Sequence, residues 1–399
     1  MPVMTPAHYA FAKLIHPTTP EEFFSEYWEK KALIVHRDDP DYYRDLLNFQ
    51  TVNDALTSLE HQQGEVFMGN HHDKIKTSDY AYESGFVDVS KLYSAFADGS
   101  SIALNNLHNR VGPLGNLCRS MEAELSIRFQ TNIYFTPPDA QCFPPHYDTH
   151  CVFALQCEGK KTWRLYDFPV ELPFHTQEFN PERDPIGEKT DEFVLSAGDF
   201  VYCPRGLGHD ADTQGFDDPS LHITLGVLQK NWSDLLLEAM AQVSVDDPQL
   251  RQGLPIGFAR PGFDREAARE TYKEMVALAM EKMDFDTAMD FFVDDVVVTR
   301  HPLIPGQFEQ VMMVRDLNTV DRRAGRRPNL LYRMEVKDGK VTLFFYGRQI
   351  TMPEHAAEPM RFALENDDYP IAAIPGQLDD PGKLVLIRRL VREGLVMLK

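Results

Sequence analysis

The segment Val152-Phe-Ala-Leu-Gln-Cys-Glu-Gly-Lys-Lys-Thr-Trp-Arg-Leu-Tyr166 decides the fold class of this 399-residue chain. Two short runs rich in β-branched, aliphatic and aromatic residues flank the turn Glu158-Gly159, a pattern typical of a tight β-hairpin. Similar runs lie at residues 127–135, 191–195, 199–202 and 222–227. Short strands separated by Gly and Pro turns predict a β-sandwich or β-barrel.

The periodicity is helical on both sides of this strand-rich region. A helical pattern begins at Pro20, and another begins at Trp232. Two apolar sets repeat there with helical spacing: Trp232, Leu235, Leu236, Met240 and Val243, then Tyr272, Met275, Val276, Ala279 and Met283. The end of the chain mixes a strand-like run (340–346) with a helix-like run (382–391). We therefore expect a β-rich region with N-terminal helical elements at 1–228, a helical segment at 229–290 and an α+β module at 291–399.

Composition limits the classes of partner. Hydrophobic residues make up 43% of the chain, which is enough for the cores of two or three domains. The formal net charge of −21 argues against general binding to nucleic acid or to anionic membranes. The acidic balance either serves solubility alone or attracts a basic polypeptide, and charge does not distinguish these two.

Cysteine usage and the N-terminus bear on the compartment. The five cysteines are an odd number and form no CxxC pair, which favours a reducing compartment over a disulfide scaffold or a cysteine zinc site. The first 24 residues lack the basic start and long apolar run of a signal peptide. No apolar stretch approaches the roughly 18 residues that span a bilayer. We expect a soluble, cytoplasmic protein with no membrane partner.

The strongest chemical motif is His146-Tyr147-Asp148 with a distal His209. Residues i and i+2 of a strand point to the same side, so His146 and Asp148 can share one metal ion. Two imidazoles and one carboxylate leave open positions on the ion, which is the pattern of non-haem Fe(II) sites. The extended Pro144-Pro145 before the motif strengthens this interpretation, since a bare HxD pattern often arises by chance.

Lys161 is the candidate partner of an anionic co-substrate. Strand alternation puts Lys161, Trp163 and Leu165 on one face, which is apolar except for the lysine. If that face is buried, the ammonium needs an anion such as a carboxylate of 2-oxoglutarate. If the other face is buried, Lys161 is solvated, and periodicity alone leaves both arrangements open.

Several runs carry a resemblance to a known family: Thr131-Asn-Ile-Tyr-Phe-Thr-Pro-Pro138, Pro144-Pro-His-Tyr-Asp148, the strands and turn of 153–166, Gly198-Asp-Phe-Val-Tyr-Cys-Pro-Arg-Gly-Leu-Gly-His209 and Ser220-Leu-His-Ile-Thr224. Over about residues 100–240 the chain closely resembles the JmjC-type ribosomal oxygenases. These are Fe(II)- and 2-oxoglutarate-dependent protein hydroxylases with a cupin fold, also called a double-stranded β-helix. The resemblance to the rest of the chain is only one of general organisation.

This resemblance implies roles for individual residues. It makes His146, Asp148 and His209 the iron ligands and Lys161 the partner of the 2-oxoglutarate C5 carboxylate. It places Asn132, Thr224 and His222 beside the co-substrate, with Tyr134 on the same strand face as Asn132. It implies that Fe(II), 2-oxoglutarate and O₂ are used together, that 229–290 forms a homodimer interface, and that 291–399 is a winged-helix-like module.

The leading hypothesis is hydroxylation of a side chain, Arg or His, in a basic ribosomal protein, for which an acidic catalyst is electrostatically matched. The same chemistry could instead demethylate N-methyl-lysine or hydroxylate a peptide natural product. A non-catalytic cupin scaffold, and a metal-dependent isomerase or a dioxygenase that does not use 2-oxoglutarate, are further alternatives. The combination of the metal triad with Lys161 favours the oxygenase over both of these.

Two other features carry less weight. His71-His72 and His150 suggest a second metal only weakly, because no carboxylate spacing accompanies them. The basic run 322–327 could contact nucleic acid or act as a nuclear signal, but a solvated loop is the simpler expectation.

Overall fold

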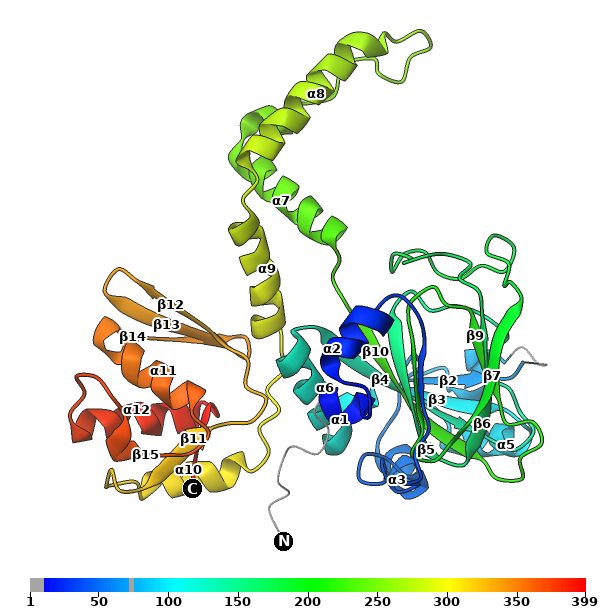
Figure 1. Ribbon diagram of the computed structural model, residues 1–399, viewed down its shortest axis with the longest axis horizontal. Helices are drawn as coiled ribbons and strands as arrows, with labels where there is room; N and C mark the ends of the chain where they lie inside the picture. The colour runs from blue at the N-terminus through cyan, green and yellow to red at the C-terminus, as the bar shows by residue number, and fades with distance from the viewer. Residues whose placement is uncertain (1–10, 72–74) are drawn as a thin grey trace. The chain divides into compact units, whose positions relative to one another are not determined.

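The structure is a computed structural model that describes residues 11–71 and 75–399. The chain divides into two compact units, Met1–Gln229 and Lys230–Lys399 (Figure 1). All six strands expected between residues 127 and 227 are present. No helix in the described ranges combines the length and the apolar character that crossing a membrane requires.

The larger sheet of the first unit has seven antiparallel strands. Their order is β1 (Leu33–Val35), β8 (Phe200–Cys203), β5 (Cys151–Glu158), β10 (Ser220–Leu228), β4 (Arg128–Thr136), β3 (Ser101–Asn105) and β2 (Val66–Gly69). The central strand β10 pairs with β4 over its whole length, and this register places Tyr134 opposite His222 and Asn132 opposite Thr224.

A smaller sheet has the order β7 (Lys189–Ser196), β6 (Lys160–Tyr166) and β9 (His209–Asp212). Between β5 and β10 the chain crosses repeatedly between the sheets: β5, β8 and β10 belong to the larger sheet, and β6, β7 and β9 belong to the smaller sheet. This interleaving of two facing antiparallel sheets is a double-stranded β-helix, so the expected cupin fold is confirmed. The hairpin expected at Glu158-Gly159 joins β5 to β6.

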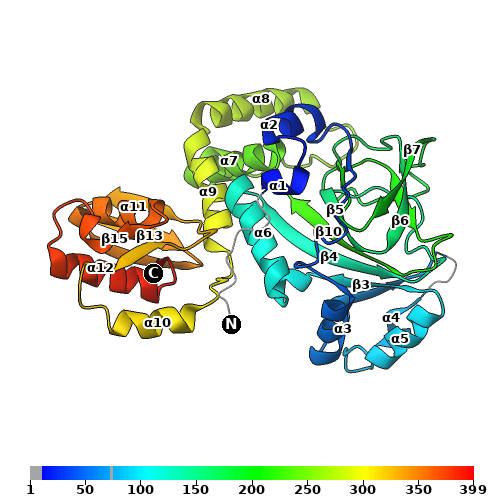
Figure 2. The same ribbon diagram turned by 60° about the horizontal axis from the view of Figure 1, so that its bottom comes forward.

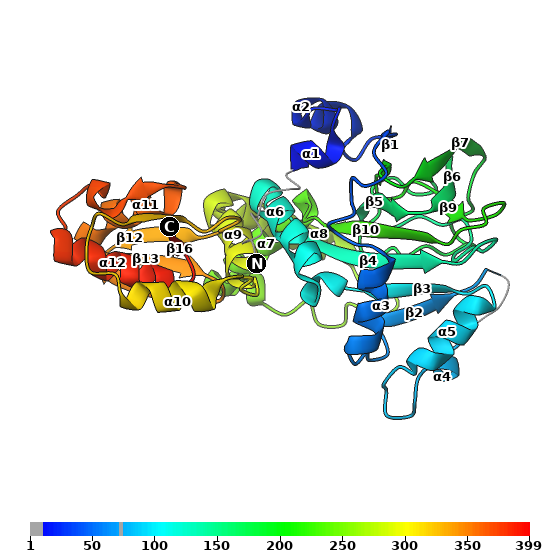
Figure 3. The same cartoon turned by 90° about the horizontal axis from the view of Figure 1, so that it is seen from below.

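Alternation along β5 separates two cores. Phe153 and Leu155 belong to a large cluster that also takes in apolar residues of the helices on the outer face of the larger sheet. Val152 and Ala154 point the other way, into a small core between the sheets. Helix α6 runs along β4 on the outer face (Figures 2 and 3). Helical elements of this unit are α1 (Phe11–Ile15), α2 (Pro20–Glu22), η1 (Phe23–Tyr27), α3 (Phe49–Ser58), α4 (Thr77–Tyr80), α5 (Val89–Ala97), η2 (Leu107–Asn109) and α6 (Gly112–Leu125).

The second unit begins with helices, as the change of period predicts. The Asn231 side chain accepts hydrogen bonds from the N–H groups of Ser233 and Asp234, and this capping box explains why α7 begins at Trp232. The helical elements here are α7 (Trp232–Asp246), η3 (Pro248–Arg251), α8 (Arg265–Lys282), α9 (Phe285–Val298), α10 (Gln307–Arg315), η4 (Glu354–Ala356), α11 (Ala357–Glu365), η5 (Ile371–Ala373) and α12 (Asp380–Arg392).

The α+β module expected at the C-terminus is present, with its own apolar core. One sheet has the order β15 (Tyr369–Pro370), β11 (Arg323–Arg326) and β16 (Val396–Leu398), and the other has the order β12 (Arg333–Lys337), β13 (Lys340–Phe345) and β14 (Arg348–Pro353). The expected border at 290/291 falls inside α9. The three-part division and the winged-helix character of the module remain predictions.

The expectation of a solvated loop at 322–327 is wrong. Four of these residues form strand β11, which pairs with β15 on one side and β16 on the other. Two of the four arginines form ion pairs, Arg323 with Asp368 at 2.9 Å and Arg326 with Asp367 at 2.5 Å. Arg327 is buried and donates to the carbonyl oxygen of Gly394. A local run of charged residues predicts a loop poorly, because it carries no information about strand pairing.

The β5–β6 hairpin gives the first testable prediction. Gly159 has a φ of +68°, and a Cβ there would lie 2.1 Å from the Pro219 carbonyl oxygen. Gly159→Ala should therefore lower the free energy of unfolding by at least about 2 kcal/mol in urea titrations. Gly215→Ala is the matched control, since its φ is +77° but nothing lies near its Cβ. Equal losses in the two variants would show that the close approach to Pro219 does not matter.

Candidate functional site

The structure brings the three residues of the predicted triad together. His146 and Asp148 lie on the segment that leads into β5, and His209 is the first residue of β9. His146 and His209 exchange backbone hydrogen bonds of 3.0 and 2.7 Å, and their ring centroids are 4.8 Å apart. Asp148 Oδ2 lies 3.7 Å from His209 Nε2. One donor atom from each residue lies within 4.8 Å of the others, so one ion can contact all three.

Both histidines are held in the same tautomer. Nδ1 of His146 is 2.9 Å from the Pro144 carbonyl oxygen, and Nδ1 of His209 is 3.0 Å from that of Leu207. A carbonyl oxygen only accepts, so each Nδ1 carries a proton, and Nε2 is the ring atom that can bind a metal. Burial, with the adjacent His146, lowers the pKa of His209, which keeps this ring neutral.

The Asp148 carboxylate is ionised. Burial would raise its pKa, but the rings of His209, His146 and His150 outweigh burial and bring the pKa below its ordinary value. The Asp148 carbonyl oxygen accepts a hydrogen bond from the N–H of Gly206 at 2.9 Å. A Cβ on Gly206 would lie 2.0 Å from a neighbouring carbonyl oxygen, so only glycine permits this tie between the β8–β9 turn and the triad.

Tyr147, between two members of the triad, points away from it. Its hydroxyl donates to the Gln177 carbonyl oxygen and to an Asp184 carboxylate oxygen, both at 3.0 Å. Asp184 in turn accepts from the Arg183 guanidinium, which lowers the pKa of Asp184 to about 2. The long β6–β7 loop is thereby attached to the backbone that carries the triad.

A cavity of about 250 Å³ lies beside the triad. Six of the rings that line it contact one another in a closed circle, with successive centroids 4.8 to 6.0 Å apart: Phe143, His146, His209, Trp163, His222 and Tyr134. A wall of this kind limits the access of water, so charges inside it interact strongly.

Lys161 projects into this cavity, which resolves the alternative left open by periodicity. Its side chain is 2% exposed, and Nζ lies 3.4 Å from His222 Nδ1. Burial lowers the pKa of Lys161 to about 8, against the opposing effect of Cys142 and Asp212. Burial and Lys161 hold the pKa of His222 well below its ordinary value, so the neutral His222 can accept from the ammonium. No described carboxylate forms an ion pair with Lys161.

The other predicted residues divide into two groups. Tyr134, His222 and Thr224 line the cavity. Asn132 does not, although it lies opposite Thr224 on the neighbouring strand; its side-chain oxygen accepts from the Asn106 N–H at 3.4 Å.

Three residues that were not predicted as part of the site also line the cavity: Trp163, Cys142 and Phe143. For Trp163 the signal was present, because it alternates onto the same strand face as Lys161. Its buried Nε1 has no hydrogen-bond partner in the described part of the chain. Cys142 and Phe143 gave no signal, because the irregular backbone before His146 has no periodicity from which to read a face.

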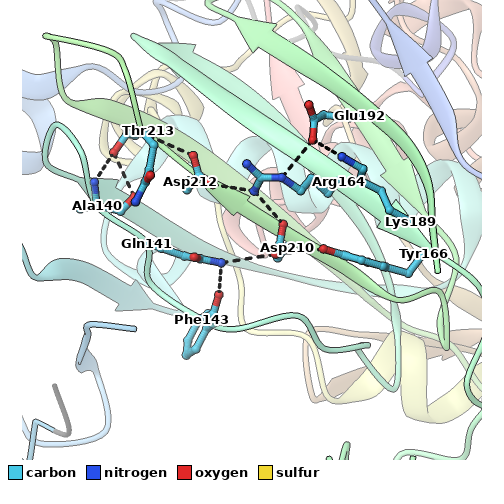
Figure 4. A network of polar contacts seen from close by, with 11 residues as sticks. Ala140, Gln141, Phe143, Arg164, Tyr166, Lys189, Glu192, Asp210, Asp212 and Thr213 are labelled. Atoms are coloured by element: carbon cyan, nitrogen blue, oxygen red, sulfur yellow. Dashed lines mark hydrogen bonds and ion pairs between the residues drawn. The ribbon is translucent and has the colours of Figure 1, made fainter. Parts of the chain in front are cut away.

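The outer surface of the smaller sheet carries a polar network behind the triad (Figure 4). Arg164 reaches Asp212 at 2.5 Å, Asp210 at 3.2 Å and Glu192 at 3.1 Å. Lys189 donates to Glu192 at 2.7 Å. The network joins β6, β7 and β9 and thereby fixes the strand that begins with His209.

Within the described residues, the triad is the one group of three or more His, Cys, Asp or Glu side chains that could hold a metal ion. His71 and His150 belong to no such group, and His72 lies outside the described residues. The donor set of two neutral imidazoles and one carboxylate fits Fe(II). The buried Lys161 ammonium fits the far carboxylate of a dicarboxylic acid such as 2-oxoglutarate.

A family model for the JmjC domain matches residues 107–235. The chain is 31% identical over 311 residues to the bifunctional lysine-specific demethylase and histidyl-hydroxylase NO66 of Aedes aegypti, covering 74% of this chain and 48% of that protein. It is 30% identical over 378 residues to ribosomal oxygenase 1 of Gallus gallus, covering 89% of this chain and 61% of that protein. Residues 107–235 thus match a JmjC domain, and most of the chain is similar in sequence to proteins named ribosomal oxygenases. Each of these relatives extends well beyond the matched region.

Solved structures agree on the fold. The Escherichia coli protein YcfD matches with a TM-score of 0.54 at 16% identity, over 95% of this chain and 98% of that one. A second structure of YcfD, in complex with cobalt and 2-oxoglutarate, matches with a TM-score of 0.52 at 17% identity, with the same coverage.

Burial of Lys161 leads to a prediction about stability. The cost of a cationic Lys161 is present below pH 8 and disappears as the pH rises to the ordinary lysine value of about 10.4. Lys161→Met should therefore raise the free energy of unfolding of the metal-free protein at pH 7 by about 1–3 kcal/mol. Urea titrations at pH 7 and near pH 10.5 should show this advantage shrinking at the higher pH. A variant less stable than the parent at pH 7 would contradict the buried-cation interpretation.

Proposed function

We propose that the protein is an Fe(II)- and 2-oxoglutarate-dependent oxygenase that hydroxylates a side chain of a basic ribosomal polypeptide. The observation that carries this proposal is the presence, in one cavity, of a pre-oriented His146–Asp148–His209 triad and a buried lysine without a carboxylate partner. A binding scaffold has no need of a buried cation, which costs stability unless an anion meets it.

Each residue has a defined role in this proposal. His146 and His209 bind the metal through Nε2 and Asp148 binds it through a carboxylate oxygen, while Lys161 binds the C5 carboxylate of 2-oxoglutarate. His222 orients the Lys161 ammonium, and Thr224 and Tyr134 border the co-substrate. The bound iron and 2-oxoglutarate supply the oxidation: O₂ converts a substrate C–H to C–O–H while 2-oxoglutarate becomes succinate and CO₂. The ring of aromatic side chains excludes water from this chemistry.

The substrate assignment rests on charge and on the relatives. The chain has a net charge of −21, which favours association with an Arg- and Lys-rich polypeptide. The relatives are named ribosomal oxygenase and histidyl-hydroxylase, which supports a His side chain as the target, with Arg as the other candidate.

The second candidate is N-methyl-lysine demethylation, because the Aedes aegypti relative is also named a lysine-specific demethylase. Hydroxylation of an N-methyl group would begin from the same removal of hydrogen from carbon. The triad and Lys161 therefore serve either reaction equally.

The direct test is incubation of the Fe(II)-loaded protein with 2-oxoglutarate and a total extract of ribosomal proteins. Mass spectrometry should show a gain of about 16 Da on one polypeptide, with stoichiometric succinate. His146→Ala and Lys161→Met should abolish both, and Lys161→Arg should retain part, since either cation can bind a carboxylate. His355→Ala, an exposed histidine of the second unit, is the matched control and should behave like the parent.

The outcomes separate the alternatives. Loss of about 14 Da from methylated lysine peptides would support the demethylase. Production of succinate without a modified ribosomal protein would support the oxygenase activity but contradict the proposal that the substrate is a ribosomal protein. If iron is bound but His146-dependent succinate is absent, the oxygenase proposal is wrong.

We further propose a homodimer formed through the helices of 229–290, with the protein working in the cytoplasm. Apolar side chains on these helices are strongly exposed in the isolated chain: Trp232, Leu236, Leu237, Tyr272 and Met280. All five cysteines are free and buried, which is compatible with a reducing compartment.

Replacing two of these side chains tests the dimer. Leu236→Glu combined with Leu237→Glu should convert the dimer to a monomer in sedimentation velocity, because the charges would be buried at the interface. Val385→Glu, an equally exposed change on α12, should leave the dimer intact. A monomeric parent protein would rule out this assembly.

A further inference from the structure

The backbone that leads to His146 is not a regular strand. Beside β9 it forms isolated bridges at two points, Gln141 opposite Asp212 and His146 opposite His209. Between these bridges the chain advances five residues on one side while β9 advances three on the other. Two extra residues therefore bulge out directly before a proposed metal ligand.

The bulge lacks the usual means of holding a strand in register. Pro144 and Pro145 have no N–H group to donate. In the described part of the chain, no residue from Cys142 to Pro145 forms a backbone hydrogen bond with β9. Among the described residues, the backbone hydrogen bonds exchanged at His146 join this end of the bulge to β9, so side-chain contacts must fix the shape of the bulge.

The side chain of Gln141 spans the bulge. Its Nε2 donates to the carbonyl oxygen of Phe143 at 2.9 Å and to a carboxylate oxygen of Asp210 at 3.4 Å (Figure 4). Phe143 is in the bulge, and Asp210 directly follows His209 on β9. One amide group therefore connects the backbone that carries His146 to the strand that carries His209.

The far end of this connection is itself fixed. Asp210 is 6% exposed and accepts hydrogen bonds from Arg164 Nη1 at 3.2 Å and from the Tyr166 hydroxyl at 3.3 Å. Both donors belong to β6, which pairs with β9 in regular register. The Gln141 amide is thus bonded to a carboxylate that cannot easily move.

We propose that Gln141 is a positioning residue for the metal centre: by bridging the bulge to Asp210 it sets the separation of His146 from His209. This inference rests on the proposed metal site but adds a residue that contacts neither metal nor co-substrate. Apart from this amide, the described residues tie the bulge through ring packing of Phe143 on Tyr134 and His146 and through the backbone bridge at His146. His209 is held in addition by the regular pairing of β9 with β6, so loss of the amide should loosen His146 more than His209.

The test uses Gln141→Met, which keeps the length and approximate volume of the side chain but has no donor. We expect Co(II) to bind this variant about tenfold more weakly in titration calorimetry, the lower end of the range for groups that support metal ligands. The visible absorption of the bound Co(II) should change as well, because the geometry of the imidazole ligand changes. Gln310→Met is the matched control, since that buried amide bonds the backbone of Leu398 in the second unit and should leave Co(II) binding unchanged.

Unchanged affinity together with an unchanged Co(II) spectrum in Gln141→Met would overturn the proposal. If this variant does not fold, Gln141→Glu takes its place, since it retains the shape, loses the donor and sets a second carboxylate against Asp210. A parent protein that binds no Co(II) would refute the proposed metal site and this role together. Parent-like binding by the variant, with His146→Ala unable to bind, would refute only the role of Gln141.

Discussion

His146 and His209 exchange two backbone hydrogen bonds, and the first unit is arranged around this contact. The two residues are far apart in the chain, and each depends on a different neighbour. His209 opens β9, which is held by β6 with Leu165 opposite His209. His146 comes from an irregular segment that, among the described residues, bridges β9 at isolated points and has no second strand of its own on the other side. The two facing sheets of the cupin fold make this contact possible, and the polar network on the outer surface of the smaller sheet holds it from behind.

The cavity places one buried cation beside a cluster of groups that are mostly neutral. Asp148 is ionised, but His209 and His222 are neutral, and the Cys142 thiol stays protonated because burial raises its pKa to about 11. Lys161 is left as the group whose charge depends most on what occupies the cavity. Strongly shifted groups gathered in one cavity are typical of functional sites, whereas a core selected for stability alone would avoid them.

Much of the site could be predicted because its residues follow simple rules. Strand alternation relates His146 to Asp148 and Lys161 to Trp163, and both relations hold in the structure. Side-chain directions could not be predicted where the regular pairing of strands ends. Cys142 and Phe143 occupy a bulge, whose direction no periodicity encodes. Asn132 is on the expected strand and face, yet its side chain is engaged by Asn106, a contact that a pattern of residue types does not contain. The strand within the charged run 322–327 could not be predicted locally, because its pairing partners lie about 45 to 74 residues further along the chain.

The hydroxyl of Tyr147 gives the β6–β7 loop an unusual relation to the triad. Two residues that face the cavity flank a residue whose hydroxyl holds the loop from the opposite side, through Asp184 and the Gln177 carbonyl. The backbone of 146–148 therefore connects the β6–β7 loop, through Tyr147, to the two side chains that face the cavity. A displacement of the loop would rotate both flanking side chains at once, and an ion gripped by them would restrain the loop in return. Ordering of the β6–β7 loop and binding of an ion by the triad would then be coupled, so that each favours the other.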